Sequence, residues 1–282
     1  MSTWGAGEKK EGEVVKEIIN WETNNIEKPE AFTTLLFGDT GCGKTYTAFT
    51  FPEPIYVIDT EARAISTKYY NFPNKKIFIQ EPLEFKTEFD LKDDDPLDTH
   101  GTIEKITKLV IDFANRVKSE EIKGGTMVID STTDLWFLIQ DWGVYELSKY
   151  TNKDGTKKAD IMMMRVGNQL DWKLMNKRHL ILVNILKQLN KYGIYVVFTA
   201  REDNPPEYAQ KVANVEVKDK IRAQKDLPFV ADVIINLKKQ VVQGQLIKYM
   251  GFIEKLSGKP RPVQPLENPT YEKIQNLLIR NE

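Results

Sequence analysis

The sequence has almost no cysteine: Cys42 is the only one among 282 residues. A lone cysteine cannot close an internal disulfide, which excludes the disulfide-stabilised class of small secreted domains and favours a reducing, intracellular setting. Long apolar runs are absent as well, since the longest, such as residues 194–198, are far shorter than the roughly 20 residues that cross a bilayer. Residues 1–30 are charged and carry no apolar central run of the kind found in secretory signals. We therefore expect a soluble, cytoplasmic protein with no membrane partner.

Neither sign of charge predominates. Forty Lys and Arg residues face 41 Asp and Glu residues, which gives a net charge of -1 and a pI near 6.3. The chain as a whole is no polycation, so any binding to nucleic acid would have to use local basic loops. The hydrophobic content of 41% is enough for a sizeable core, and we find no internal repeat. The length favours one large domain, alone or with appendages.

One stretch matches the phosphate-binding loop of nucleoside triphosphatases, G-x-x-x-x-G-K-T. Residues 32–37 before it suit a buried strand, and residues 46–49 after it can begin a helix that Pro52 stops. Glycines let the backbone turn tightly and point its N–H groups inward, and a helix N-terminus adds partial positive charge. Lys44 can reach the β- and γ-phosphates of ATP, while the Thr45 hydroxyl can complete the shell of a bound Mg²⁺. The residues expected to bind the nucleotide are Gly38, Asp39, Thr40, Gly41, Cys42, Gly43, Lys44 and Thr45.

Two further apolar stretches lead into acidic residues. Residues 55–59 predict a strand followed by Thr60 and Glu61, and residues 126–130 predict a strand that ends in Asp130. Parallel sheets place their ligands beyond the carboxyl ends of the strands, so both acids would face the nucleotide. Asp130 would hold Mg²⁺ directly or through water. Glu61 is the candidate base that orients and polarises the attacking water, with a capping or solvated residue as the alternative.

A third strand is expected at residues 194–198, followed by Thr199, Ala200 and Arg201. Arg201 would then lie at the same edge of the sheet as Glu61 and Asp130. A basic residue there can sense the γ-phosphate, although a surface ion pair is an equally good interpretation. Cys42 lies at a helix N-terminus, where a thiolate is favoured, so thiol modification is expected to block ATP binding and Mg²⁺-ATP to protect the thiol.

The rest of the chain alternates between helical and strand patterns. Apolar residues at helical spacing predict helices over residues 102–118, 132–147 and 162–192. Short apolar runs predict strands over residues 76–80 and 229–237, then a hairpin through residues 243–245 into residues 246–253. A short helix is expected within residues 271–278. The expected domains are residues 1–30 as an N-terminal arm or short helix, residues 31–257 as the core, and residues 258–282 as a tail. A segment that docks on a neighbouring subunit is a further interpretation of residues 1–30.

Two polar stretches carry basic residues that could contact a DNA backbone. They span residues 148–160, where Tyr150 lies among the lysines, and residues 202–226, where acidic residues nearly balance the basic ones. Exposed connectors are the alternative interpretation. The candidate DNA contacts are Lys149, Lys153, Lys157, Lys158, Lys211, Lys218, Lys220 and Arg222.

The order of these motifs resembles the RecA-like recombinase superfamily. More narrowly, it resembles the compact RecA-like ATPases of phages, archaeal viruses and plasmids that are linked to single-strand DNA recombination. The resemblance rests on residues 38–45, 57–61, 128–131, 196–201, 227–234 and 252–255. It implies an α/β fold with a RecA-like P-loop NTPase core, a mainly parallel central sheet flanked by helices, and a C-terminal β-hairpin.

The same resemblance implies roles for particular residues. It makes Glu61 the catalytic carboxylate and places the two DNA-binding loops at residues 148–160 and 202–226. In this family a basic residue of the next subunit completes the nucleotide site, and Lys255 resembles that residue, with Arg261 second. The chain departs from recombinases in carrying Ala200 and Arg201 where they carry an Asn-Gln pair.

The expected function is a Mg²⁺-dependent ATPase that acts on single-stranded DNA in recombination, annealing or repair as an oligomer or filament. Its cofactors would be ATP and Mg²⁺, and a replication or recombination protein is a possible partner. One alternative is a nucleotide-switched loader or assembly factor whose main partner is a protein. Another is a translocating motor for helicase or packaging work.

Overall fold

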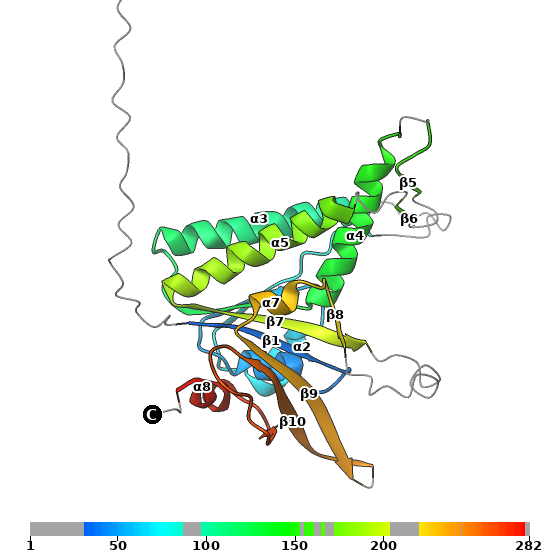
Figure 1. Cartoon of the computed structure of the whole chain (residues 1–282). Coiled ribbons are helices and arrows are strands. Elements are labelled where there is room, and N and C mark those ends of the chain that lie inside the picture. The colour runs from blue at the N-terminus through cyan, green and yellow to red at the C-terminus, as the bar shows by residue number, and fades with distance from the viewer. Residues whose placement is uncertain are drawn as a thin grey trace, which may run out of the picture.

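The computed structural model describes residues 31–86, 97–152, 155–160, 165–166, 172–203, 220–242 and 244–279. It contains a nine-stranded sheet. Eight of its strands follow the order β11-β10-β9-β1-β7-β4-β2-β3, and the ninth, β8, pairs with β7. Helices cover both faces of this sheet (Figure 1). The prediction of an α/β fold with a mainly parallel central sheet is therefore confirmed.

Six neighbouring strands of the sheet run parallel. They are β9 (Val233–Val242), β1 (Thr33–Gly38), β7 (Ile194–Asp203), β4 (Gly125–Asp130), β2 (Ile55–Asp59) and β3 (Ile77–Gln80). β1 and β4 are buried along their whole length, which explains why both read as continuous apolar runs rather than alternating ones. β7 lies between them, so three strand ends meet at one edge of the sheet.

Two apolar cores lie on opposite faces of the sheet. Along β1, Leu35 and Phe37 face one core and Leu36 the other, as the alternation of side chains in a strand requires. The first core is covered by α3 (Thr99–Lys118), α4 (Thr132–Ser148) and α5 (Trp172–Gln188), and the second by α1 (Lys44–Phe49), α2 (Ala64–Asn71) and α8 (Tyr271–Ile279). Among the helices of the described ranges, none combines the length and apolar character that a membrane span needs.

The C-terminal part joins the same sheet. β10 (Gln245–Leu256) pairs antiparallel with β9, as the predicted hairpin requires, and β11 (Leu266–Glu267) pairs with β10. The predicted short helix is α8, which buries Ile274 completely. The Tyr271 ring packs against Phe51 and Tyr195, each with a centroid distance of 5.2 Å. These contacts anchor α8 to the sheet through aromatic packing.

Three predicted boundaries are wrong. The helix expected over residues 162–192 begins at Trp172 and ends in a 3-10 turn, η2 (Leu189–Tyr192), while Arg165–Val166 form strand β6, which pairs with β5 (Ala159–Asp160). The strand expected from residue 229 begins at Val233, because Pro228 favours the first turn of the short helix α7 (Leu227–Val230). The polar stretch expected as one loop contains the end of β7 and strand β8 (Lys220–Arg222).

A buried histidine lies where α5 packs on α4. The His179 side chain is fully buried, and within the described residues neither ring nitrogen has a hydrogen-bond partner. Its ring makes an edge contact with Trp136 at a centroid distance of 5.6 Å. Burial lowers the pKa of His179 to about 4, although the charge of Asp226 acts in the opposite direction. The fold therefore requires a neutral imidazole at this position.

This burial makes stability depend on pH. The unfolded chain protonates His179 near pH 6.5 and the folded chain only near pH 4, so stability is lost as the pH falls between these values. The pKa shift predicts a decrease of about 3 kcal/mol in the free energy of unfolding over this pH range, and His179→Gln should abolish this decrease. We would measure urea unfolding at pH 7 and pH 4.5, with the exposed His100→Gln as the matched control. Equal pH slopes for the wild type and His179→Gln would contradict the account.

Candidate functional site

The phosphate-binding loop follows β1 directly and depends on its glycines. Gly38, Gly41 and Gly43 have φ angles of +151°, +73° and +90°. A Cβ atom on Gly38 would lie 2.2 Å from the carbonyl oxygen of Leu237, so only glycine fits where β9 approaches the loop. Gly43 is the N-cap of α1, and the ring of Tyr249 packs against it. The loop is therefore shaped by both its own sequence and the neighbouring C-terminal strands.

Lys44 is held in the loop by backbone carbonyls. Its Nζ donates to the carbonyl oxygens of Gly38 and Asp39 at 3.0 and 2.9 Å. The ammonium group is thus positioned at the loop without a carboxylate partner among the described residues. A phosphate can take the place of these neutral acceptors and would gain a charged hydrogen bond.

Asp130 ends β4 as a buried carboxylate. Its Oδ2 accepts a hydrogen bond from the Thr45 hydroxyl at 2.7 Å, and its Oδ1 accepts one from the hydroxyl of Thr199 on β7. Burial raises the pKa of Asp130 to about 6, against the lowering effect of these two hydroxyls. A buried carboxylate is stabilised by a nearby cation, so this position suits one.

The oxygen atoms of Thr45 and Asp130 fit a magnesium ion. Mg²⁺ prefers hard oxygen ligands and usually binds one or two protein groups together with phosphates and water. Within the part of the chain that the structure describes, no three His, Cys, Asp or Glu side chains come together as a metal cage. One hydroxyl and one carboxylate beside a phosphate loop are therefore the arrangement expected for a nucleotide-bound metal.

Glu61 is fixed by a short turn after β2. The carboxylate of Asp59 accepts hydrogen bonds from the backbone N–H groups of Glu61 at 3.0 Å and of Ala64 at 2.7 Å. The Thr60 hydroxyl donates to the carbonyl of Ser131 at 3.0 Å and accepts from the N–H of Ser131 at 2.9 Å. These bonds connect the ends of β2 and β4, so Glu61 is held beside Asp130.

Arg201 bridges two carboxylates at this edge. Its Nη2 lies 3.2 Å from Glu61 Oε1 and 2.9 Å from Asp134 Oδ2. Burial favours the neutral form of Glu61, but the charge of Arg201 and several hydrogen bonds outweigh it, so the pKa of Glu61 lies below its usual value. Burial, with a contribution from the Glu61 charge, raises the pKa of Asp134. Of these two carboxyl groups, Glu61 is therefore the more acidic.

The same residues connect β7 to β8. The backbone N–H of Arg201 donates to the Thr133 hydroxyl at 2.8 Å, and that hydroxyl donates to the carbonyl of Arg222. Arg201 and Arg222 also face each other in the β7–β8 register. The first turn of α4 thus joins the Arg201 end of β7 to strand β8.

A cavity of about 460 Å³ unites these side chains. It is lined by Lys44, Thr45, Glu61, Asp130 and Arg201, as the sequence predicts, and by further loop residues Thr40, Gly41 and Gly43. Its volume falls in the range of small-molecule sites. A larger cavity, of about 850 Å³, contains none of the motif residues. We assign the nucleotide to the smaller one because the phosphate and metal chemistry gathers there.

Several lining residues were missed by the sequence analysis. They are Tyr46, Arg63, Thr67 and Asn71 near α1 and α2, and Tyr249 on β10. Tyr249 could not be found from spacing, because about 200 residues separate it from the loop. Asp134, which pairs with Arg201, was also missed. It could have been found from the sequence, because Ser131, the N-cap of α4, and Asp134 match the S-x-x-D pattern typical of a helix start.

Cys42 corrects an expectation. The sequence rule predicts a thiolate at the helix N-terminus, but only 1% of the Cys42 side chain is exposed, and it packs in the second apolar core. Burial raises the pKa of the Cys42 thiol, although Lys44 acts to lower it. The thiol is therefore neutral at physiological pH and is a poor probe of nucleotide binding.

The candidate trans-acting residues contact their own chain. Lys255 Nζ donates to the carbonyls of Pro228 and Ala231 at 3.1 and 2.6 Å, and Arg261 Nη1 donates to the carbonyl of Glu254 at 3.2 Å. Lys255 pairs with the start of β9, so it lies at the end of the sheet away from the phosphate loop. Neither residue reaches the nucleotide site of its own subunit, and a role in a neighbouring one stays a prediction.

The candidate DNA contacts fall into two described groups. Lys149 forms an ion pair with Glu146 and lies 4.4 Å from the centroid of the Tyr145 ring, while Lys157 and Lys158 follow in a backbone-paired turn. Lys220 and Arg222 lie on β8 rather than in a loop. Lys153, Lys211 and Lys218 lie outside the described residues.

The comparisons with known proteins give one match. No curated protein matches the chain. The family model AAA_24, described as an AAA domain, matches residues 30–262, which is well over half of the chain. The match includes the phosphate loop, Glu61, Asp130 and Arg201, and the parallel sheet that holds them is the fold expected of such a domain. The chain therefore belongs to the AAA_24 family of AAA domains, and its core is a P-loop ATPase domain.

Proposed function

We propose that this protein is a Mg²⁺-dependent ATP hydrolase of the compact RecA-like type, which acts on single-stranded DNA in recombination, annealing or repair as an oligomer or filament. The observation that carries the proposal is the gathering of Lys44, Thr45, Asp130, Glu61 and Arg201 around one cavity. These side chains come from four strand ends, and their chemistry matches the separate tasks of phosphoryl transfer.

Each side chain has a distinct task in this proposal. Lys44 binds the β- and γ-phosphates, and the hydroxyl of Thr45 and the carboxylate of Asp130 would hold Mg²⁺. The metal would neutralise charge on the phosphate oxygens when bound. Glu61 orients the attacking water, since its carboxylate is ionised and fixed by the Asp59 turn. The protein thus contributes positioning and electrostatic stabilisation.

Arg201 links hydrolysis to the γ-phosphate. Its guanidinium group is shared between Glu61 and Asp134, and 40% of the side chain is exposed toward the cavity. A γ-phosphate would compete for this cation, which would free Glu61 from its ion pair and raise its basicity. Asp134 then acts as the anchor that keeps Arg201 within reach of the phosphate.

The DNA part of the proposal is supported by two groups of basic side chains, one beside the nucleotide edge and one at the far end of α4. Lys220 and Arg222 lie on β8, which pairs with the last residues of β7, next to Arg201. Tyr150 is 59% exposed close to Lys149, Lys157 and Lys158, and an exposed aromatic ring among lysines suits stacking with a base. DNA binding at β8 would change the position of Arg201 through the hydroxyl of Thr133, which is hydrogen-bonded to the backbone of both Arg222 and Arg201.

Replacing the candidate base should separate binding from hydrolysis. Glu61→Gln is expected to bind ATP with normal affinity and to lower kcat by a factor of about 10² to 10⁴, because it keeps the shape but removes the base. Lys44→Ala should abolish turnover and weaken binding. We would measure fluorescent ATP binding and phosphate release in parallel. Normal turnover in Glu61→Gln would remove Glu61 from its assigned role.

Removing the anchor of Arg201 should have a smaller effect. Asp134→Asn is expected to lower kcat about tenfold with little change in KM for ATP, because the partly exposed ion pair guides Arg201 without contacting the substrate. Asp112→Asn, an acidic-to-amide change on the outside of α3, is the matched control. An unchanged kcat in Asp134→Asn would show that Arg201 needs no second carboxylate.

The DNA contacts can be tested through salt dependence. The ATPase rate should rise with single-stranded DNA, and DNA affinity should fall as salt increases. Lys220→Gln with Arg222→Gln should reduce the slope of log affinity against log salt by about 0.7 for each phosphate that the variant no longer neutralises. The pair Lys118→Gln with Lys123→Gln is the control of equal charge. A wild-type ATPase that ignores DNA at low salt would overturn the DNA part while leaving the ATPase proposal intact.

A nucleotide-switched assembly factor is a second candidate, and one observation favours it. Tyr69 and Tyr70 on α2 are 74% and 78% exposed, and α2 also supplies Thr67 and Asn71 to the nucleotide cavity. Exposed aromatic residues beside a nucleotide site are suited to a protein partner that reads the bound state. A slow ATPase whose rate DNA does not change would support this candidate.

A further inference from the structure

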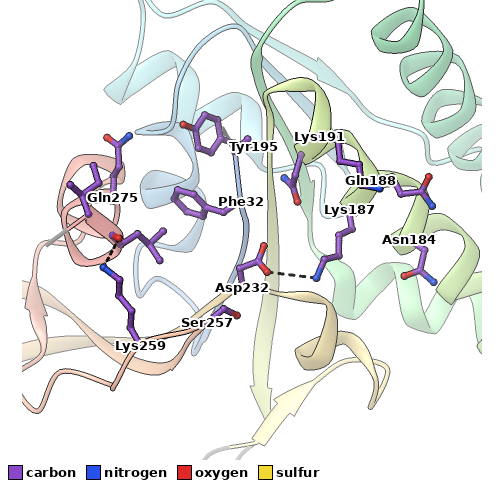
Figure 2. Close-up of a pocket in the computed structure, with 14 residues that line it drawn as sticks. Phe32, Asn184, Lys187, Gln188, Lys191, Tyr195, Asp232, Ser257, Lys259 and Gln275 are labelled. Carbon is purple, nitrogen blue, oxygen red and sulfur yellow. Dashed lines mark hydrogen bonds and ion pairs between the residues drawn. The ribbon is translucent and has the colours of Figure 1, made fainter. Parts of the chain in front are cut away.

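The cavity of about 850 Å³ lies at the end of the sheet opposite to the nucleotide site. Its lining comes from the starts of β1, β7 and β9, with α5 on one side and α8 on the other, as Figure 2 shows. Phe32, Tyr195, Leu278 and Ile279 give it apolar surface, and Ile279 is 54% exposed. An apolar cavity of this size holds several side chains at once.

The rim of this cavity is mainly basic. Lys187, Lys191 and Lys259 surround it, and Asp232 is the one carboxylate among its described lining residues. Lys187 Nζ lies 3.6 Å from Asp232 and donates to the carbonyl of Val230, and Lys259 Nζ donates to the carbonyl of Leu278 (Figure 2). Three lysines against one carboxylate leave a net positive rim, which would attract an acidic segment.

The chain itself leads into this cavity. Ala31 is 1% exposed and forms part of the cavity wall, so the segment of residues 1–30 is attached at its edge. This segment contains seven glutamates and four lysines, and its charge is therefore opposite to that of the rim. It also contains the apolar residues Val14, Val15, Ile18, Ile19 and Trp21 within eight positions.

We propose that residues 14–21 of the same chain dock in this cavity, with Ile18, Ile19 and Trp21 against its apolar wall and the neighbouring glutamates near the lysines. The nine residues between Trp21 and Ala31 span up to about 30 Å, which is enough to reach any part of the cavity. Attachment at the rim gives the segment a high effective concentration, which favours docking within one chain over binding between chains.

Docking here would stabilise the core and leave the nucleotide site open. The cavity joins α5, α8 and three strand starts, so a segment that fills it would bury apolar surface shared by these elements. The nucleotide cavity lies at the other strand ends. We therefore expect docking to affect thermal stability and to leave ATP affinity unchanged.

Crosslinking in the full-length chain tests this proposal. Asn20→Cys with Gln275→Cys would place one thiol in the segment and one on the cavity wall, and the buried native Cys42 should compete little. A short bis-maleimide should give an intramolecular crosslink in most molecules, detected by denaturing gel and peptide mass spectrometry. Asn20→Cys with Ile65→Cys is the control, because the 58% exposed Ile65 is on α2 near the nucleotide site.

Two further changes separate docking from chance contact. Lys191→Glu should lower the crosslink yield at least twofold at low salt, while Lys239→Glu, a charge reversal at an exposed position toward the other end of β9, should leave it unchanged. Ile18→Asp with Ile19→Asp should lower both the yield and the Tm. A yield no higher than in the Ile65 control would overturn the proposal. Covalent dimers in place of the intramolecular product would assign the cavity to the segment of a second copy and would also overturn it.

Discussion

The buried Asp130 carboxylate is the constraint on which the site depends. It accepts hydroxyl hydrogen bonds from Thr45, at the start of α1, and from Thr199, on β7, and so joins the ends of three strands. Burying a carboxylate is costly unless it is hydrogen-bonded or paired with a cation. The two hydroxyls offset part of this cost, but burial still raises the pKa of Asp130 to about 6. A metal ion beside the phosphate loop would stabilise the ionised carboxylate further.

A second set of contacts, centred on Arg201, surrounds Asp130 and links the nucleotide cavity to strand β8. Arg201 connects Glu61 to Asp134, and its own backbone connects to β8 through Thr133. An ion pair shared between two carboxylates can be redistributed by a new anion without unfolding any element. In the proposed function, the contacts that keep Glu61 ionised would therefore also couple the nucleotide state to strand β8, which carries Lys220 and Arg222.

Much of this arrangement could be predicted from sequence, because the central strands are buried on both faces and the loop motif has fixed spacing. Asp130 and Glu61 could be placed from the ends of those strands. Tyr249 could not, because its contact with Gly43 depends on how β10 folds back beside β9. The expected Cys42 thiolate was wrong, since a rule based on the helix terminus takes no account of burial. Local patterns thus predicted which strand ends carry the polar side chains of this edge, and tertiary packing decided which other side chains join them and which are accessible.

The most direct test of the central claim is the effect of Mg²⁺ on ATP affinity in Asp130→Asn, measured by equilibrium titration at pH 8. At this pH the native carboxylate is ionised, and the amide keeps its size and can still accept from a threonine hydroxyl. We predict that Mg²⁺ strengthens ATP binding in the wild type and has little effect in Asp130→Asn, while affinity in EDTA is similar for both. An unchanged Mg²⁺ effect in Asp130→Asn would contradict the assignment of this edge of the sheet as a metal–nucleotide site.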